Sequence, residues 1–368
     1  MSFKYIQAGK VMSDPKEMIR FLDVDGNLIN KDYNPSDAEK KELLDLYKIM
    51  IRARQWDLYA LTLQKTGRLG TFAPNLGEEA CLSALGYFLK KDDWFVPHYR
   101  VLAAQLARGI SEENVFLYWR GSELGSKFAK ELNTLPMQVV IGSQISIAAG
   151  VAYALKLKNG VHNQSIALAT VGNGGTNEGE FHEGLNLASV RNLPFVLAAI
   201  NNQWAISVPE HNSYKVLTLS QRAHSYDIPG IRVDGNDLLA CSAAVKEAYQ
   251  WAREGHGPVL IEFVTWRQGQ HTTSDDPRVY RSREEEERHE RWEPMHRIEK
   301  FLFDNGLLTE EVKEKLAEDA AAEARAAYDA STLTLAKEGF EHVYDYTYAV
   351  LPEELVAQKE ANRRFLKK

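Results

Sequence analysis

Two short polar segments, "GNGG" at residues 172–175 and "NN" at residues 201–202, could together hold a phosphate group and a metal ion. Each segment follows a short apolar run of the kind that forms a buried strand. Glycines at a strand end let the backbone come close to a ligand, and amide groups at the start of the next helix favour phosphate. Side-chain oxygens such as those of Asn173 and Asn202 are the ligand type that Mg²⁺ prefers. The spacing therefore predicts a crevice for a metal-bound phosphate.

Two more familiar phosphate-binding motifs do not fit the glycine segment. A dinucleotide fingerprint, G-x-G-x-x-G, could begin at Gly172 and Gly174, but Asn177 occupies its third glycine position. A P-loop ends in Gly-Lys-Ser or Gly-Lys-Thr, and residues 171–181 contain no lysine. These residues disfavour a nucleotide-binding oxidoreductase using a nicotinamide cofactor, which we keep as an alternative class.

A βαβ pattern between residues 139 and 264 supplies the elements that must position these segments. Three unalternating apolar runs predict strands of a parallel sheet with both faces covered, at residues 165–172, 194–200 and 258–266. Helical patterns occupy residues 143–157, 178–192 and 236–254. The first of these helices is expected to be buried, and in the second Phe181, Leu185 and Leu187 to Val190 should face the core. Two parallel strands joined by one crossover helix bring their carboxyl ends to one crevice, where such sheets bind ligands.

The segments outside this pattern predict additions to the α/β core. Two short apolar runs around Asp25-Gly26 predict a hairpin in an N-terminal arm. Ser36, with Glu39 three residues later, predicts the start of a helix that stops near Gly67. Further helices are expected at residues 77–89 and after Ser111, and charged helices follow residue 280. We therefore expect an arm at residues 1–35, an α/β domain at residues 36–281 and a C-terminal helical region at residues 282–368.

Composition excludes several other classes of protein. The formal net charge is −7 and no block of Lys or Arg dominates a region, so nucleic-acid binding is not expected. No apolar run approaches the roughly 18 residues of a membrane span. The charged N-terminus lacks the apolar core of a secretory signal. Cys81 and Cys241, the two cysteines of the chain, indicate a reducing compartment, and Cys81 is expected to be a core thiol. We therefore expect a cytoplasmic protein.

Seven ordered segments extend the phosphate-site pattern over roughly residues 40–281. They read "TFAPNLGEEA", "PHYR", "IGSQISIAAGVA", "GTNEGEFHEGLNLASV", "NNQWAIS", "IPGIRVDGND" and "TWRQGQHTTSDDP". Together they resemble the alpha subunits of the thiamine-diphosphate-dependent component of 2-oxo acid dehydrogenase complexes, closest to the pyruvate type. The resemblance implies a doubly wound parallel sheet of the thiamine-diphosphate-binding type, with helical additions at both ends.

The resemblance also assigns candidate residues for the cofactor and its Mg²⁺ ion. The metal ligands would be the side chains of Asn173 and Asn202 and the backbone carbonyl of Trp204. The residues facing the cofactor would be Tyr99, Arg100, Ile141, Gly174, Gly175, Asn202, Arg267 and His271. The family has an acid where this chain has Asn173, so we expect a site that still takes Mg²⁺ but with one formal charge fewer.

Three residues are candidates for catalysis by the same resemblance. His271 lies in the loop at residues 267–281 and matches the family's active-site histidine, although Gln270 replaces the usual preceding proline. Glu180 and Glu183 lie one turn apart after the glycine segment, where they would line an acidic, water-filled path or simply favour the helix start. Ser274 lies near the family's regulatory phosphorylation region.

The implied activity is oxidative decarboxylation of pyruvate, with reductive acetylation of the lipoyl group of an acyltransferase partner. The family places one catalytic glutamate on a separate beta subunit, so this chain would be half of an active site. It would join two alpha and two beta subunits in a heterotetramer and dock on a lipoyl-bearing dihydrolipoyl acyltransferase core. Alternatives are a branched-chain 2-oxo acid dehydrogenase alpha subunit and a non-catalytic homologous scaffold.

Overall fold

Five parallel strands form the central sheet of the protein. A computed structural model describes residues 3–29, 33–160 and 165–366. The strand order across the sheet is β1-β2-β3-β7-β6, and every neighbouring pair is parallel. The strands are β1 (Trp94–Val96), β2 (Ala167–Gly172), β3 (Phe195–Asn201), β6 (Gly230–Asp234) and β7 (Val259–Val264). The three strands expected from apolar runs therefore form β2, β3 and β7, which are adjacent.

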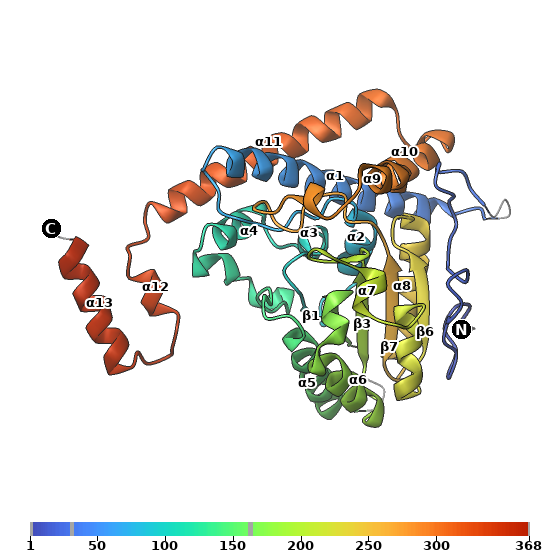
Figure 1. The fold of residues 1–368 in the computed structure, drawn as a ribbon, viewed down its shortest axis with the longest axis horizontal. Helices are drawn as coiled ribbons and strands as arrows, with labels where there is room; N and C mark the ends of the chain where they lie inside the picture. The colour runs from blue at the N-terminus through green and yellow to red at the C-terminus, as the bar shows by residue number, and fades with distance from the viewer. Residues whose placement is uncertain (1–2, 30–32, 161–164, 367–368) are drawn as a thin grey trace.

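Helices cover both faces of this sheet. Successive side chains of a strand point to opposite faces, so Leu168 and Val196 join one core cluster while Ala169 and Leu197 join another. Helices α1 (Asp37–Lys65), α2 (Glu79–Tyr87) and α8 (Leu238–Arg253) contribute to the first cluster. Helices α5 (Ser143–Asn159) and α6 (Gly179–Val190) contribute to the second (Figure 1). Burial on both faces explains why these strands lack polar alternation.

Helix α1 begins and ends where its sequence signals lie. The Ser36 side chain accepts a hydrogen bond from the Glu39 backbone, and the Glu39 carboxylate accepts one from the Ser36 backbone. Gly67 follows the last turn with a φ of 71°, a conformation that favours glycine. The expected cap of Ser111 likewise starts α4 (Glu112–Trp119). Cys81 of α2 is buried in the core, as predicted.

The apolar faces of α5 and α6 are only partly buried, which corrects two expectations. Phe181, Leu185 and Ala188 of α6 pack into the core, but Leu187 and Val190 are 38% and 71% exposed. Helix α5, expected to be buried, covers the sheet with one side and leaves Ile147 exposed. The cause is that apolar residues surround each helix while the sheet covers one side alone. This chain therefore presents an apolar surface that its own core does not use.

The N-terminal arm is an extended segment beside the sheet edge. Val11 bridges to Gly230 and Ile19 bridges to Val233 of β6, both in parallel. The expected hairpin turn at Asp25-Gly26 is present, with an antiparallel bridge between Leu22 and Leu28. The helical addition expected at this end follows the arm, as α1 and α2 before the first strand of the sheet.

The C-terminal helices divide into a packed group and a projecting group. Helices α10 (Pro294–Asp304) and α11 (Glu310–Leu335) share the core of α1, and α11 lies along α1 (Figure 1). Helices α12 (His342–Asp345) and α13 (Glu353–Leu366) stand away from the body. The remaining described helices are α3 (Leu102–Arg108), α7 (Glu210–Ser213) and α9 (Arg283–His289), with 3₁₀ turns that include η3 (Gly174–Asn177) and η4 (Leu219–Tyr226).

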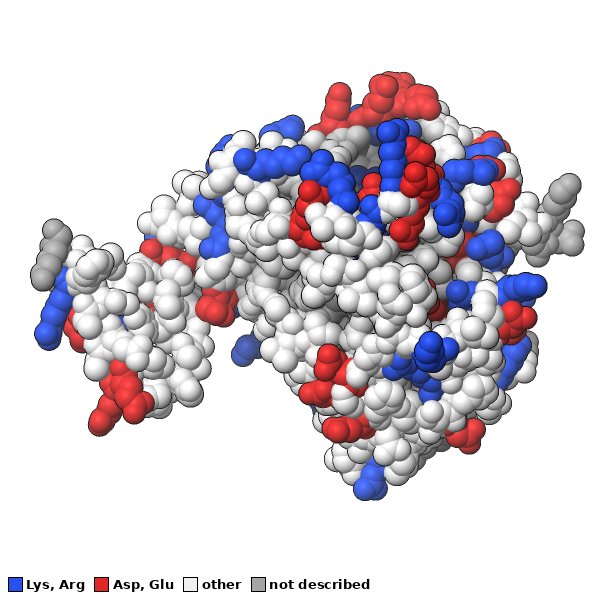
Figure 2. All heavy atoms as spheres, in the orientation of Figure 1, with Lys and Arg blue, Asp and Glu red and all other residues white. Residues whose placement is uncertain are grey.

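The surface has the mixed charge that composition predicts. On the face drawn in Figure 2, acidic and basic side chains are interspersed over the described elements. None of the described helices combines the length and the apolarity that crossing a bilayer requires.

Candidate functional site

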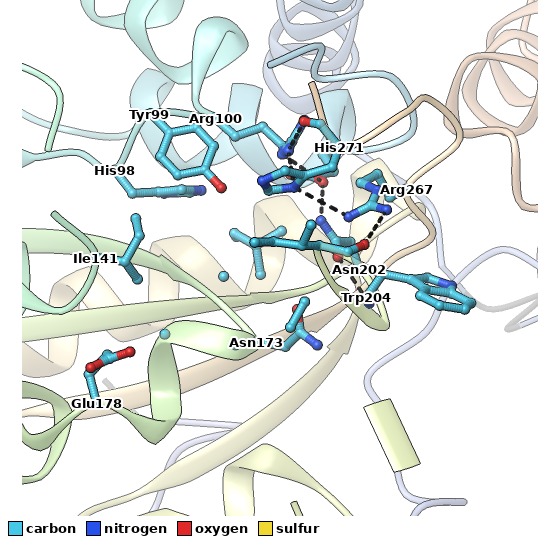
Figure 3. A pocket seen from close by; sticks show the side chains of 17 residues that line it. His98, Tyr99, Arg100, Ile141, Asn173, Glu178, Asn202, Trp204, Arg267 and His271 are labelled. Atoms are coloured by element: carbon cyan, nitrogen blue, oxygen red, sulfur yellow. Dashed lines mark hydrogen bonds and ion pairs between the residues drawn. The ribbon is translucent and has the colours of Figure 1, made fainter. Parts of the chain in front are cut away.

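A cavity of about 280 Å³ lies at the carboxyl ends of β2 and β3 (Figure 3). Ten of the residues assigned by sequence to the cofactor and metal line it: Tyr99, Arg100, Ile141, Asn173, Gly174, Gly175, Asn202, Trp204, Arg267 and His271. The other lining residues are Glu78, His98, Gly172, Glu178, Ile200, Ala205 and Ile206. Residues separated by almost 200 positions thus meet at the sheet edge where parallel sheets bind ligands.

The glycine segment after β2 is shaped by close packing. A methyl group on Gly174 would lie 2.7 Å from Ala205 Cβ, and one on Gly175 would lie 2.5 Å from Ile141 Cγ2. A methyl group on Gly172 would meet nothing within 4 Å, although Gly172 lines the cavity. The two later glycines are therefore needed for packing, whereas Gly172 keeps space open for a ligand.

Asn173 is buried between these glycines and has an unused donor. Its backbone N–H donates to the Ile200 carbonyl at 3.1 Å, which joins the ends of β2 and β3. Its side-chain Nδ2 has no hydrogen-bond partner among the described residues. A buried polar group without a partner costs free energy unless a ligand or water satisfies it. The segment thus fits a ligand that brings oxygen atoms.

The two asparagines at the end of β3, Asn201 and Asn202, have different surroundings. Asn201 donates to the Glu262 carboxylate at 2.8 Å, which fixes the strand end within the sheet. Asn202 faces the cavity, where its Nδ2 donates to Glu78 Oε1 at 2.6 Å and its Oδ1 accepts from the Trp204 backbone N–H at 3.3 Å. Only Asn202 of the pair therefore has a side chain at the cavity, and its role as a ligand stays a prediction.

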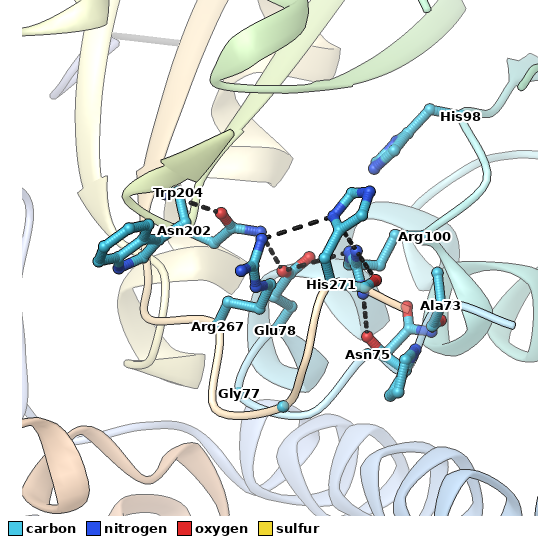
Figure 4. Close-up of polar contacts among 12 residues, drawn as sticks. Ala73, Asn75, Gly77, Glu78, His98, Arg100, Asn202, Trp204, Arg267 and His271 are labelled. Carbon is cyan, nitrogen blue, oxygen red and sulfur yellow. Dashed lines mark hydrogen bonds and ion pairs between the residues drawn. The ribbon is translucent and has the colours of Figure 1, made fainter. Parts of the chain in front are cut away.

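Glu78 is a site residue that the sequence interpretation missed. It sits at the N-terminal end of α2, is fully buried and lines the cavity (Figure 4). Burial raises the pKa of its carboxyl to about 7, although the nearby Arg100 guanidinium acts to lower it. Its contact with Asn202 spans 124 positions, so no local pattern indicates it. The available signal was the pair of glutamates in "GEEA", at the start of a helix that is otherwise apolar.

Two arginines fix the loop that carries His271. Arg100 donates from Nη1 to the Pro74 carbonyl at 2.5 Å and from Nη2 to the His271 carbonyl at 2.6 Å. Arg267 donates to the Ile206 carbonyl at 2.8 Å and to the Tyr280 hydroxyl at 2.9 Å. Both guanidinium groups are buried, so their charges act strongly on the cavity.

His271 is neutral at physiological pH, with a defined tautomer. Burial lowers its pKa to about 4, and the charges of Arg100 and Arg267 act in the same direction. Arg100 Nη2 lies 3.2 Å from His271 Nδ1. An arginine can only donate, so Nδ1 accepts and the ring proton lies on Nε2. His271 can therefore offer one N–H donor to a ligand.

His98 is a second neutral imidazole at the cavity, and it too was missed. Its Nδ1 lies 2.8 Å from the Thr170 hydroxyl, and burial lowers its pKa to about 3. Tyr99 lies beside it and meets the His271 ring edge-on, with 6.2 Å between ring centres. These aromatic groups form the wall opposite Asn173 (Figure 3).

The two acids assigned to catalysis do not line the cavity. Glu180 is half-buried near Gly142, and Glu183 is exposed on α6. Glu178, which precedes the helix, lines the cavity instead. The catalytic role of Glu180 and Glu183 therefore stays a prediction.

Contacts with residues 71–77 hold the loop at residues 267–281. Thr273 exchanges hydrogen bonds with the Phe72 backbone, and Ser274 bonds to Thr71 through their hydroxyl groups. Gly77 has a φ of 93°, and a methyl group there would lie 2.2 Å from the Trp266 carbonyl. The loop is thus positioned by a glycine turn far away in sequence.

The described part of the chain has no group of three or more His, Cys, Asp or Glu side chains placed to hold a metal. The cavity offers amide and carbonyl oxygens instead, from Asn173, Asn202 and Trp204. Such a set would bind a hard cation together with oxygens of a phosphorylated ligand. The open space at Gly172 and the unused polar atoms of Asn173 and Glu78 fit a ligand of this kind.

Comparison with known proteins identifies the family. The model of the family described as "Dehydrogenase E1 component" matches residues 47–338. The chain is 40% identical over 353 residues to the pyruvate dehydrogenase E1 component subunit alpha of Mycoplasma pneumoniae, covering 96% of this chain and 97% of that one. It is 40% identical to the protein of the same name from Acholeplasma laidlawii, with 94% and 99% covered, and 38% identical to that of Staphylococcus aureus, with 96% and 95% covered. The chain therefore belongs to the dehydrogenase E1 component family, whose members are 2-oxo acid dehydrogenase components that depend on thiamine diphosphate.

Proposed function

We propose that this chain is the alpha subunit of a pyruvate dehydrogenase. It would take part in oxidative decarboxylation of pyruvate and in reductive acetylation of a lipoyl group. The observation that supports this most is the convergence of ten assigned residues on one cavity, in a chain that matches pyruvate dehydrogenase alpha subunits over nearly its full length.

The cofactor would be thiamine diphosphate with Mg²⁺. Asn173, Asn202 and the Trp204 carbonyl would hold the cation, while Tyr99 and Arg100 would face the diphosphate. Gly174, Gly175 and Ile141 would support the cofactor through their backbones, with Arg267 steadying the loop. When bound, the cofactor supplies the carbon nucleophile and the electron sink for decarboxylation.

The residues of this chain would orient groups and exclude water. His271, neutral and protonated on Nε2, would donate a hydrogen bond to an oxygen of the reacting group. Arg100 would keep the imidazole in this tautomer, and the loop anchored on Gly77 would cover the cavity. Glu180 and Glu183 would contribute an acidic path outside the cavity.

A separate beta subunit would complete the active site in a heterotetramer of two alpha and two beta subunits. Exposed apolar side chains on α5, on α6 and on the segment before α5 are consistent with such a partner: Val139, Val140, Ile147, Leu187 and Val190. The assembly would dock on a lipoyl-bearing dihydrolipoyl acyltransferase core.

We further propose that residues 36–281 form a doubly wound domain of the thiamine-diphosphate type, between an arm at 1–35 and a helical region at 282–368. The enzyme would act in the bacterial cytoplasm, on the pyruvate that glycolysis produces.

Rates with two substrates test this proposal. The chain, combined with its beta subunit, thiamine diphosphate and Mg²⁺, should decarboxylate pyruvate faster than 3-methyl-2-oxobutanoate. A reversed preference would favour the branched-chain alternative, and no turnover of either would favour a scaffold. The chain without the beta subunit should show background rates.

A further inference from the structure

The cavity holds a buried carboxylate, although its first metal-facing position carries a neutral amide. Asn173, the first metal ligand assigned from the sequence, has an uncharged side chain. Among the lining residues, all in the described part of the chain, the acids are Glu78 and Glu178. Glu178 is exposed, whereas Glu78 is buried, so a negative charge on the Glu78 carboxyl group is little screened by water.

The contacts of Glu78 leave one oxygen unused. Oε1 accepts from Asn202 Nδ2 at 2.6 Å, and the Arg100 Nε lies 4.0 Å away. Oε2 is buried without a hydrogen-bond partner among the described residues. Burying a carboxylate costs several kcal/mol unless charges and hydrogen bonds offset it. In the described part of the chain, Glu112 also has a buried oxygen without a partner, but Glu78 is the one of these two that lines the cavity, where a ligand could use the free oxygen.

The next residue shows what a structural glutamate does at this helix end. Glu79 is also buried, but both of its oxygens are used: Oε1 accepts from Arg54 at 2.6 Å and Oε2 accepts from the Gly77 N–H at 2.9 Å. The contrast between the two neighbours indicates that Glu78 is placed for a group other than protein.

Glu78 also orients the amide of Asn202. Because Nδ2 is directed to Glu78 Oε1, the amide oxygen is directed to the other side, where it accepts from the Trp204 N–H. That contact uses one of the two lone pairs of Oδ1. The remaining lone pair is available in the cavity that Asn173, Asn202 and Trp204 line (Figure 3).

We propose that Glu78 is a positioning residue that supplies the negative charge missing at position 173 and turns the Asn202 oxygen toward the divalent cation. The negative charge of the metal site would then come from Glu78 at the start of α2, and not from a residue at the end of β2. This proposal rests on the proposed function, since it presumes a cation bound with thiamine diphosphate.

A charge-swap experiment tests it by binding and not by turnover. Thiamine diphosphate is titrated by calorimetry into the chain with its beta subunit at a series of Mg²⁺ concentrations. Glu78→Gln keeps an acceptor for Asn202 and removes the charge, and it should weaken the apparent Mg²⁺ affinity by about 10- to 100-fold. Adding Asn173→Asp to Glu78→Gln should restore most of that affinity. Equal affinities in wild type and Glu78→Gln, or no restoration in the double variant, would overturn the proposal.

A matched control and a second variant keep the test decisive. Glu112 of α4 is also buried beside an arginine, Arg52, with an unpartnered Oε2, but it lies outside the cavity, so Glu112→Gln should leave the Mg²⁺ affinity unchanged. If Glu78→Gln does not fold, Asn173→Asp alone should raise the affinity less than about tenfold, because Glu78 already provides the charge. A larger rise would contradict the proposal. If wild type shows no Mg²⁺-dependent binding of thiamine diphosphate, the proposed function itself fails.

Discussion

At the residue scale, the chemistry of the cavity depends on groups whose charge is set by burial. His271 and His98 are both held neutral, while Arg100 and Arg267 keep their positions through carbonyl and hydroxyl partners. A neutral imidazole between two guanidinium groups is a hydrogen-bond donor and not a third cation. This arrangement suits a site that receives a diphosphate without carrying excess positive charge.

The lowered pKa of His271 gives a stability that depends on pH. The folded state binds a proton at about pH 4 and the unfolded state near 6.5, so the unfolded state gains the proton first as pH falls. Wild type should therefore lose stability between pH 6.5 and 4 with a steeper slope than His271→Gln, the difference staying below about 1.4 kcal/mol per pH unit. Urea unfolding at several pH values measures it. Equal slopes of the free energy of unfolding against pH for wild type and His271→Gln would show that His271 is not held neutral.

The glycines of the segment after β2 should separate stability from binding. Gly175→Ala forces a methyl group against Ile141 and Val171, so the free energy of unfolding should fall by about 1–3 kcal/mol. Gly172→Ala meets no protein atom and should keep the stability of wild type but weaken cofactor binding. Thermal unfolding and calorimetry measure the two effects. Equal changes in stability and in cofactor binding for the two variants would contradict the different packing of Gly172 and Gly175.

At the element scale, strand and helix positions follow from short-range signals. The capping box at Ser36, the stop at Gly67 and three apolar runs locate α1, β2, β3 and β7 because each depends on neighbours in sequence. The exposed side of α6 could not be predicted, since Leu187 and Val190 look like core residues and only the position of the sheet reveals otherwise. The position of Glu78 in the cavity could not be predicted for a similar reason, because its partner Asn202 is distant in sequence.

Asp237 links the N-terminal arm to α8. One carboxylate oxygen accepts from the backbones of Phe21 and Leu22, and the other accepts from Leu239 and Ala240 at the helix start. In Asp237→Asn an NH₂ group, which can only donate, replaces one carboxylate oxygen, and two of these hydrogen bonds are lost. The free energy of unfolding should therefore fall by about 1–3 kcal/mol. Asp304→Asn, which removes an exposed ion pair with Lys300, should change the free energy of unfolding by less than about 0.5 kcal/mol. The urea concentration at the midpoint of unfolding is measured for both variants. Equal losses of stability would show that Asp237 does not link the arm to α8.

At the scale of the whole molecule, the chain leaves apolar side chains of α5 and α6 uncovered. These helices pack one side on the sheet, through residues such as Ala148 and Leu185, and leave Ile147, Leu187 and Val190 exposed on the other. Proteins seldom leave such patches in contact with water without a partner. We expect the beta subunit to cover this surface.

Val190→Asp should weaken association with the beta subunit by at least about tenfold, because the added charge would lose its water in the interface. Leu333→Asp, on an exposed position of α11, is the matched control and should leave association intact. Analytical ultracentrifugation of each variant with the beta subunit gives the comparison. Should both variants assemble like wild type, the partner must bind elsewhere.

The most direct measurement is a crystal structure of the chain with its beta subunit, thiamine diphosphate and Mg²⁺. The diphosphate is expected at the carboxyl ends of β2 and β3, with the cation bound by Asn173, Asn202 and the Trp204 carbonyl. A cofactor bound away from these strand ends, or a cation held by other residues, would contradict it.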